Sequence, residues 1–103
     1  MPWADHFIAR LIAGETVQFR PSGNSMEPRI RSRQLVTVAP VQAGQVKHGD
    51  VVLCEVKGKQ FLHLVVNDRH GLHKEFLIGN MRGFTNGWTP AEKIYGKLIK
   101  VDP

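Results

Sequence analysis

A chain of 103 residues holds one domain with a modest core and leaves no room for a second folded unit. Its 42% apolar and 22% charged residues exclude a disordered tail, and its net charge of +5 is compatible with acidic peptides or phosphates as partners. The sequence has neither the start of a secretory signal nor an apolar window approaching the ~18 residues that span a bilayer. We therefore expect a soluble, cytoplasmic protein without a transmembrane anchor.

The first element expected along the chain is one short amphipathic helix over residues 3–13, with Gly14 as its stop signal. Apolar residues recur there at helical spacing, namely Trp3, Phe7, Ile8, Leu11 and Ile12. We expect this apolar stripe to dock on the domain, with dimerisation or contact with a membrane surface as alternatives. Residues 1–15 are therefore assigned to an N-terminal amphipathic helix and residues 16–103 to the main domain.

After Gly14 the pattern changes to short runs that are typical of β-strands and are separated by Gly and Pro residues. The runs are residues 16–19, 34–38, 51–56, 60–66, 75–78 and 93–101. Residues 57–59, Lys-Gly-Lys, are the clearest hairpin turn. Residues 86–90 are interpreted as a turn in which Trp88 packs or lines a peptide-binding edge. The sequence thus predicts a mostly β fold, a compact, curled antiparallel sheet or barrel-like structure with one short N-terminal helix.

The cysteine and histidine content gives no sign of a metal site. Cys54 is the only cysteine and lies in the apolar run 51–54, so we expect a buried free thiol. His70 and His73 have a spacing that a metal could use, but no third ligand accompanies them in a polar loop. We therefore expect neither a metal nor a cofactor.

Arg29, Arg31 and Arg33 form the main basic cluster. On an extended segment their alternation would place all three guanidinium groups on one face, where phosphates or an acidic peptide could bind. No aromatic residue interleaves with them and no nucleic-acid motif surrounds them. We interpret the cluster as a solvated edge and keep a nucleic-acid partner only as the less favoured alternative.

The segment of residues 20–28, Arg-Pro-Ser-Gly-Asn-Ser-Met-Glu-Pro, is the most informative for chemistry. Gly23 permits a left-handed backbone, and Pro28 fixes the exit of the turn. A serine held between them, Ser25, can expose both its hydroxyl and neighbouring backbone N–H groups. Such a turn can build an oxyanion hole, although a Ser-rich Gly/Pro loop is also a common surface turn.

A nucleophilic serine needs a base held on a rigid element. Lys57 and Lys59 flank the hairpin turn, where water keeps their amines charged. His63 lies in a predicted strand and shares one face with Phe61 and Val65, so partial burial is expected. A neutral imidazole there can accept a proton near pH 7. On this pattern alone, a hydrogen-bonded structural histidine is the alternative.

Four segments resemble, in order, the S24/S26 serine peptidases, the superfamily of type I signal peptidases and LexA/UmuD-like self-cleaving proteins. They are residues 23–28 (Gly-Asn-Ser-Met-Glu-Pro), 47–53 (Lys-His-Gly-Asp-Val-Val-Leu), 61–65 (Phe-Leu-His-Leu-Val) and 94–101 (Ile-Tyr-Gly-Lys-Leu-Ile-Lys-Val). The resemblance runs from about Val17 to Val101 and implies the curled β fold of that superfamily.

The resemblance also implies roles for individual residues. In that superfamily the serine before methionine is the nucleophile, which is Ser25 here. His63 takes the base position, as in the endoplasmic-reticulum and archaeal signal peptidases, whereas bacterial members carry lysine there. The residues expected to position the serine, the oxyanion and the histidine are Gly23, Asn24, Met26 and Asn80.

The chain departs from the pattern of that superfamily at three points. No segment of the sequence is expected to form the membrane anchor of signal peptidases, Leu64 replaces the basic residue that follows the base, and Gly79-Asn80 replaces a Gly-Asp pair. In the histidine-type enzymes a downstream aspartate orients the imidazole. Only Asn80 or Asn86 could do so in the corresponding segment here, and Asp68 is an alternative partner that the sequence does not place.

The sequence is compatible with three functions. The first is a serine endopeptidase that cuts an extended peptide with a Ser/His dyad, after a small residue as the resemblance implies. The second is a catalytically weak or inactive relative that binds a peptide or partner protein in the same groove. The third is a self-cleaving regulator cut at Ala13-Gly14; a DNA repressor is not expected, because no helix-turn-helix precedes Ser25. The expected partner is a peptide or protein substrate, and homodimerisation stays open.

Overall fold

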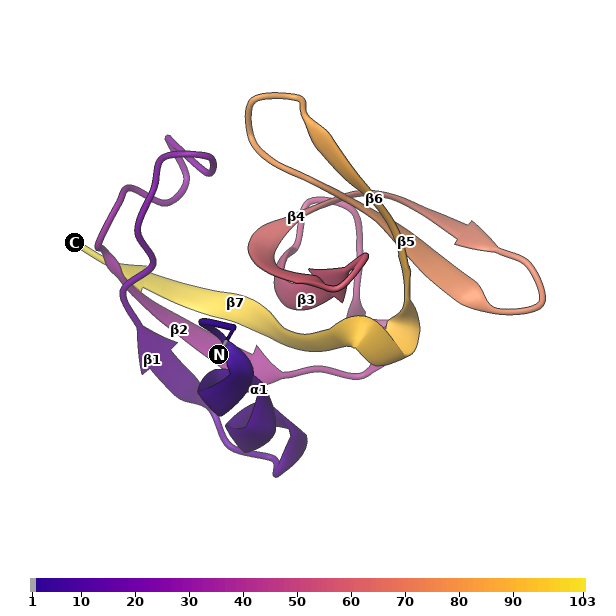
Figure 1. The fold of residues 1–103 in the computed structure, drawn as a ribbon, viewed down its shortest axis with the longest axis horizontal. Helices are drawn as coiled ribbons and strands as arrows, with labels where there is room; N and C mark the ends of the chain where they lie inside the picture. The colour runs from indigo at the N-terminus through magenta and orange to yellow at the C-terminus, as the bar shows by residue number, and fades with distance from the viewer. Residues whose placement is uncertain (1) are drawn as a thin grey trace.

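The computed structural model describes residues 2–103, so Met1 of the expected segment 1–15 lies outside the described residues. Within them, antiparallel strands and one short α-helix account for the regular structure, with two 3₁₀ turns (Figure 1). The elements are α1 (Asp5–Ile12), β1 (Val17–Phe19), β2 (Leu35–Pro40), η1 (Ala43–Gln45), β3 (Val51–Val56), β4 (Lys59–His70), β5 (Lys74–Gly79), β6 (Thr85–Pro90), η2 (Ala91–Lys93) and β7 (Ile94–Asp102). The predicted mostly β fold with one N-terminal helix is confirmed.

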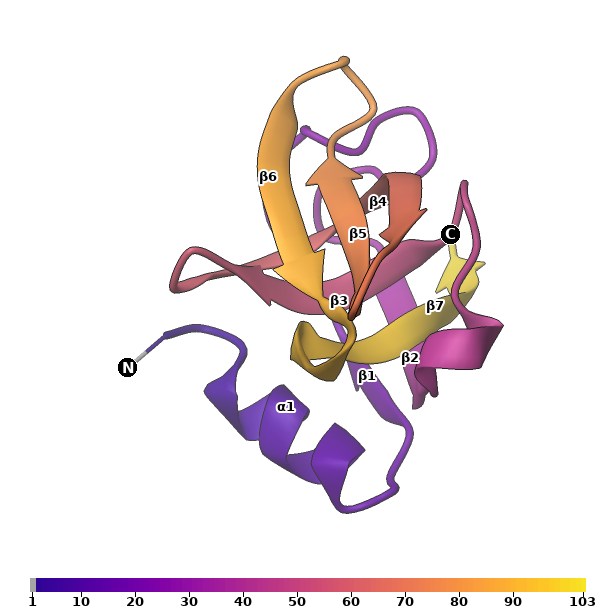
Figure 2. The same cartoon turned by 90° about the vertical axis from the view of Figure 1, so that its right-hand side faces the viewer.

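The seven strands form a single sheet in the order β1-β2-β7-β3-β4-β5-β6, and each neighbouring pair is antiparallel. The sheet is curled but open, because β1 and β6 remain as its two edges (Figure 1). Helix α1 lies against the part made by β1, β2 and β7. The hairpin of β5 and β6 lies at the other end of the molecule (Figure 2).

The predicted hairpin between β3 and β4 is confirmed. Val56 pairs with Lys59, so the loop contains two residues, Lys57 and Gly58. Both have positive φ, 52° and 81°, which matches the right-handed twist of the flanking strands. Strand β4 continues to His70, beyond the predicted end at residue 66.

The interpretation of residues 86–90 as a turn is wrong, because these residues belong to strand β6. Trp88 pairs with Leu77 of β5. Gly87 and Pro90 suggested a turn, yet an edge strand tolerates both, since one side of its backbone needs no partner strand. The Trp88 ring packs under the Arg69 guanidinium at 4.1 Å.

Helix α1 docks on the sheet as expected. Ile8 and Leu11 are buried in the first of two hydrophobic clusters, which also includes Val36, Val38 and Phe19. The stripe is not fully covered, because Ile12 is 72% exposed. With eight residues, α1 is too short to cross a bilayer, and no other helix in residues 2–103 has the length and apolar character for it.

The second hydrophobic cluster lies on the other side of β3. Side chains alternate along this strand, so Val51 and Leu53 enter the first cluster while Val52 and Cys54 enter the second. Cys54 is fully buried, as predicted. Burial raises the pKa of its thiol to about 12, which keeps it protonated and unreactive.

The arginine cluster does not lie on a strand. Residues 25–30 and 32–33 form turns and bends between β1 and β2, and Arg31 lies between them without regular structure. Arg29 donates a hydrogen bond to the Gly49 carbonyl, and Arg33 adopts a positive φ of 69°. The alternation that would have aligned Arg29, Arg31 and Arg33 on one face therefore does not apply.

Candidate active site

Ser25 lies in the long loop between β1 and β2, and hydrogen bonds close this loop at its base. The Arg33 N–H donates to the Pro21 carbonyl at 2.7 Å. The Gly23 N–H donates to the Ser32 hydroxyl oxygen at 3.0 Å, and Gly23 has φ 107°, the left-handed backbone that the sequence suggested. These contacts hold the segment that carries Ser25 in a defined turn.

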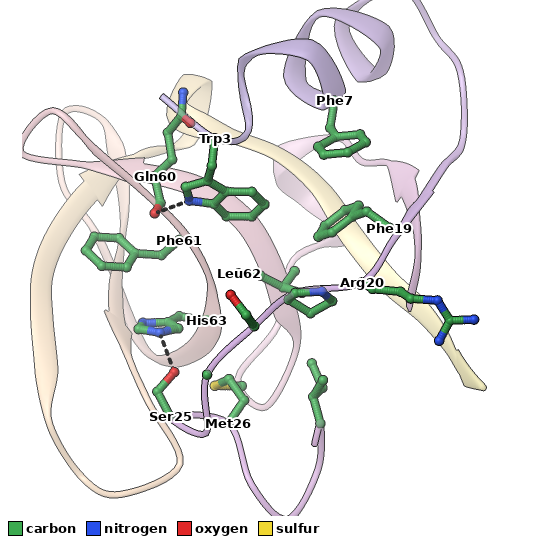
Figure 3. A pocket seen from close by; sticks show the side chains of 14 residues that line it. Trp3, Phe7, Phe19, Arg20, Ser25, Met26, Gln60, Phe61, Leu62 and His63 are labelled. Carbon is green, nitrogen blue, oxygen red and sulfur yellow. Dashed lines mark hydrogen bonds between the residues drawn. The ribbon is translucent and has the colours of Figure 1, made fainter. Parts of the chain in front are cut away.

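Apolar packing and one backbone hydrogen bond hold the Ser25 loop against the rest of the fold. Met26 and Ile30 are buried in the first hydrophobic cluster and anchor the loop from within. The Met81 N–H, from the loop between β5 and β6, donates to the Ser25 carbonyl at 3.1 Å. Ser25 is thereby left half-buried, with its hydroxyl turned toward β4 (Figure 3).

The structure brings Ser25 and His63 together. The Ser25 Oγ lies 3.1 Å from Nε2 of His63, within hydrogen-bond distance (Figure 3). His63 projects from β4, and its ring stacks on that of Phe61, with centroids 4.9 Å apart and planes 27° apart. A rigid strand and an aromatic neighbour thus hold the imidazole beside the hydroxyl.

Asn86 of β6 binds the other imidazole nitrogen. Its Oδ1 lies 2.8 Å from Nδ1 of His63. A carboxamide oxygen can only accept, so Nδ1 carries the proton and Nε2 is free to accept one from Ser25. Burial lowers the pKa of His63 below its ordinary value, and the hydrogen bond to Asn86 opposes that shift only in part.

Asn80, the residue expected to position the histidine, lies elsewhere. Its Oδ1 accepts the backbone N–H groups of Arg82 at 2.8 Å and Phe84 at 3.1 Å, which closes the loop between β5 and β6. That loop carries Met81, so Asn80 supports the Ser25 backbone rather than the imidazole. The sequence favours Asn80 over Asn86 because Gly79-Asn80 stands where many members of the superfamily have a Gly-Asp pair.

The Asp68 side chain, the other partner considered for His63, lies toward the far end of β4. Its two carboxylate oxygens contact Nε2 of His48 and Nε2 of His70. Within the described range, no group of three or more His, Cys, Asp or Glu side chains is arranged to hold a metal ion. His73 is exposed in the turn that follows β4.

Asn24, one of the residues expected to position the oxyanion, contributes its backbone to the turn that carries Ser25. Asn24 is exposed, and its carbonyl accepts the Glu27 N–H at 3.2 Å. Among residues 2–103, no protein group accepts the backbone N–H of Ser25. This N–H is thus available to a ligand beside the hydroxyl.

Ser25 and His63 line one end of a surface groove with a volume of about 620 Å³. The groove follows the first half of β4 toward Gln60, and Pro21 and Ser22 also line it. Aromatic side chains line the end away from Ser25 (Figure 3), namely those of Trp3, Phe7 and Phe19. A strand edge, the Ser25 hydroxyl and an apolar end lie along one depression.

The Ala13-Gly14 dipeptide lies outside this groove, at the end of α1. The Ala13 N–H donates to the Ala9 carbonyl at 3.1 Å, and the Gly14 N–H donates to the Leu11 carbonyl at 3.0 Å. The helix end would have to unwind before this peptide bond could be presented to any serine.

A protein-family model described as Peptidase S24-like matches residues 1–73. The matched region includes both Ser25 and His63 and ends before Asn86. Searches of curated proteins and of solved structures gave no significant match.

Proposed function

The chain belongs to the Peptidase S24-like family, and on that premise we propose that it is a serine endopeptidase with Ser25 as nucleophile and His63 as general base. The observation that carries the proposal is the contact of 3.1 Å between Ser25 Oγ and His63 Nε2. Because Asn86 occupies Nδ1, the nitrogen that faces the hydroxyl is the one able to accept its proton.

The proposed reaction has two steps. Ser25 Oγ attacks the carbonyl carbon of a peptide bond, its proton passes to Nε2 of His63, and the backbone N–H of Ser25 donates to the oxyanion that forms. The imidazolium then protonates the departing amine, which leaves an ester on Ser25. Water, deprotonated by the same Nε2, hydrolyses this ester and regenerates the free hydroxyl.

The proposed substrate is an extended peptide that lies in the groove beside β4. Backbone hydrogen bonds from a strand edge suit such a ligand, since they do not depend on its side chains. The resemblance to signal peptidases implies a small residue, such as alanine, before the cut.

The amide at Nδ1 favours a second candidate function. A carboxylate there stabilises the imidazolium that forms during attack, whereas the Asn86 carboxamide orients the ring without supplying a negative charge. A chain with this arrangement could bind a peptide in the groove and turn it over slowly or not at all.

A phosphonylating probe directed at activated serines tests the proposal. We expect the wild-type protein to be labelled on Ser25 and the Ser25→Ala variant to remain unlabelled. Ser22→Ala is the matched control, because Ser22 also lines the groove but does not contact His63. Equal labelling of the wild type and Ser25→Ala would exclude Ser25 as nucleophile. An unlabelled wild type that still binds peptides would support the second candidate.

A further inference from the structure

We propose that Trp3 is a specificity-determining residue, which walls an apolar subsite for a large aliphatic or aromatic side chain of the bound peptide. The subsite lies about three residues along the peptide from the bond at Ser25. This inference rests on the proposed function, because it takes the groove to be the place where a peptide binds.

The first half of β4 offers an unpaired backbone edge to such a peptide. Residues 59–63 pair with β3 on one side only, and pairing with β5 begins at Leu64. The Gln60 carbonyl points away from β3, since it accepts the indole N–H of Trp3 at 3.2 Å. Leu62, two residues on, directs its backbone groups the same way. No loop or side chain within residues 2–103 hydrogen-bonds to them.

The N-terminal segment is fastened to the outer end of this edge. Besides the Trp3 indole, the Ala4 N–H donates to Oε1 of Gln60 at 2.8 Å, and Nε2 of Gln60 donates to the Asp5 carboxylate. Gln60 therefore holds three consecutive residues of the N-terminal segment. The part of the β4 edge that is open to a peptide therefore ends at Gln60, whose carbonyl already accepts the indole N–H of Trp3.

Trp3, Phe7 and Phe19 form an aromatic cluster between the N-terminal segment and β1. The Trp3 and Phe19 rings lie with centroids 5.6 Å apart, and Phe7 stacks on Phe19 at 4.6 Å. Trp3 nevertheless remains 49% exposed and lines the groove (Figure 3). An apolar side chain placed against the indole would remove this surface from water, which is favourable.

The spacing sets the position of the recognised residue. Gln60 precedes His63 by three residues, and a strand rises about 3.3 Å per residue, so the Trp3 end lies roughly 10 Å from the reactive serine. An extended peptide has the same rise. Its third residue from the cleaved bond would therefore reach the aromatic cluster.

The charge of the groove also favours an apolar residue there. Arg20 is the one permanently charged side chain among the described residues that line it. Its guanidinium donates to the Arg33 carbonyl at 2.9 Å and points away from the aromatic cluster (Figure 3). The subsite thus has no charged partner to offer an acidic or basic side chain.

Peptide binding to the full chain carrying Ser25→Ala and Trp88→Phe tests the inference. In this background Trp3 is the only indole and no cleavage occurs. A decapeptide of Ala, Ser and Gly residues with one central Leu is compared with the same peptide carrying Ser in place of Leu. We expect the Leu peptide to bind about tenfold more tightly and to shift the Trp3 emission to shorter wavelength.

Replacement of Trp3 supplies the decisive comparison, with peptide binding then followed by calorimetry. Trp3→Ala should reduce the preference for Leu to less than about threefold, whereas Trp3→Phe, which keeps an aromatic ring, should retain most of it. An unchanged preference in a folded Trp3→Ala variant, or no peptide binding at all, would overturn the inference. A Leu preference without probe labelling of the wild-type protein would instead overturn the peptidase proposal and leave the subsite standing. In an active wild type, the cut should fall three residues from the Leu.

Discussion

At the scale of single residues, His63 is the group whose protonation governs the proposed reaction. Only the neutral imidazole can accept the serine proton, and burial beside Phe61 lowers the His63 pKa below its ordinary value. As pH rises, activity should therefore increase with a midpoint below ~6.5, the ordinary pKa of an imidazole. It should be complete close to neutral pH. A profile of kcat/KM against pH measures this. A limb that rises only above about pH 8 would indicate a lysine base instead.

Variants of His63 separate a catalytic role from a structural one. His63→Ala and His63→Gln should both lower kcat/KM by at least about a thousandfold, because neither side chain accepts a proton at neutral pH. Their far-ultraviolet circular dichroism should remain that of the wild type, since His63 is only partly buried. Activity that persists in both variants would make His63 a structural histidine.

The residue that orients His63 offers a more specific test. Asn86→Asp would place a carboxylate 2.8 Å from Nδ1. A negative charge at that distance stabilises the imidazolium, so the acid limb of the pH profile should move upward by roughly one pH unit or more. Asn86→Ala removes the hydrogen bond that partly opposes the lowering of the His63 pKa, so the limb should move to lower pH, and kcat should fall because the ring is no longer oriented. A limb that stays in place in Asn86→Asp would show that this contact does not form in solution.

Sequence reasoning located the serine and the histidine but was less definite about the orienting amide. Ser25 and His63 could be predicted because the segments around them, residues 23–28 and 61–65, resemble segments of the S24/S26 serine peptidases. Asn80 and Asn86 are both flanked by glycine, and nothing local distinguishes them. The choice depends on β6 pairing beside β5, which carries Asn86 to Nδ1 and leaves Asn80 in the loop.

At the scale of elements, the approach of α1 to the sheet depends on Gly96 of β7. A Cβ at this position would lie 2.7 Å from Val38 Cγ1, 2.9 Å from the Ala39 carbonyl oxygen and 3.0 Å from Leu11 Cδ1. Gly96→Ala should therefore destabilise the fold by about 1–3 kcal/mol and lower Tm by at least about 4 °C. Gly71→Ala is the control, since a Cβ there meets nothing within 4 Å. Equal Tm values for the two variants would contradict this account.

The elements that the sequence predicted best are those that consist mainly of buried apolar residues. Strand β3, residues 51–56, is apolar at every position except Glu55, and its observed bounds are those predicted from the sequence. The outer half of β4 is polar and largely exposed, so only its pairing with β5 makes it a strand. Strand β6 contains Gly87 and Pro90, and its pairing likewise outweighs a local preference for a turn.

At the scale of the whole molecule, the central strand β3 joins the two hydrophobic clusters, because its successive side chains enter opposite sides. The loop of Ser25 is anchored in the first cluster through Met26, while His63 and Asn86 come from strands that also border the second. The candidate site therefore spans both clusters. The geometry of the site therefore depends on both clusters remaining packed against β3.

This arrangement predicts that the molecule unfolds as one unit, and its two tryptophans can report on it. Trp3 contacts Phe19 of the first cluster, whereas Trp88 lies on β6, whose Thr89 hydroxyl donates to the Glu55 carbonyl of β3 at 2.6 Å. In the single-tryptophan variants Trp88→Phe and Trp3→Phe, fluorescence should follow the same urea transition that circular dichroism gives for each variant. Shared packing across β3 leaves no boundary at which one cluster could melt alone. If Trp3 fluorescence changed at lower urea than the circular dichroism of the same variant, the N-terminal segment would be a separate unit that detaches before the sheet unfolds.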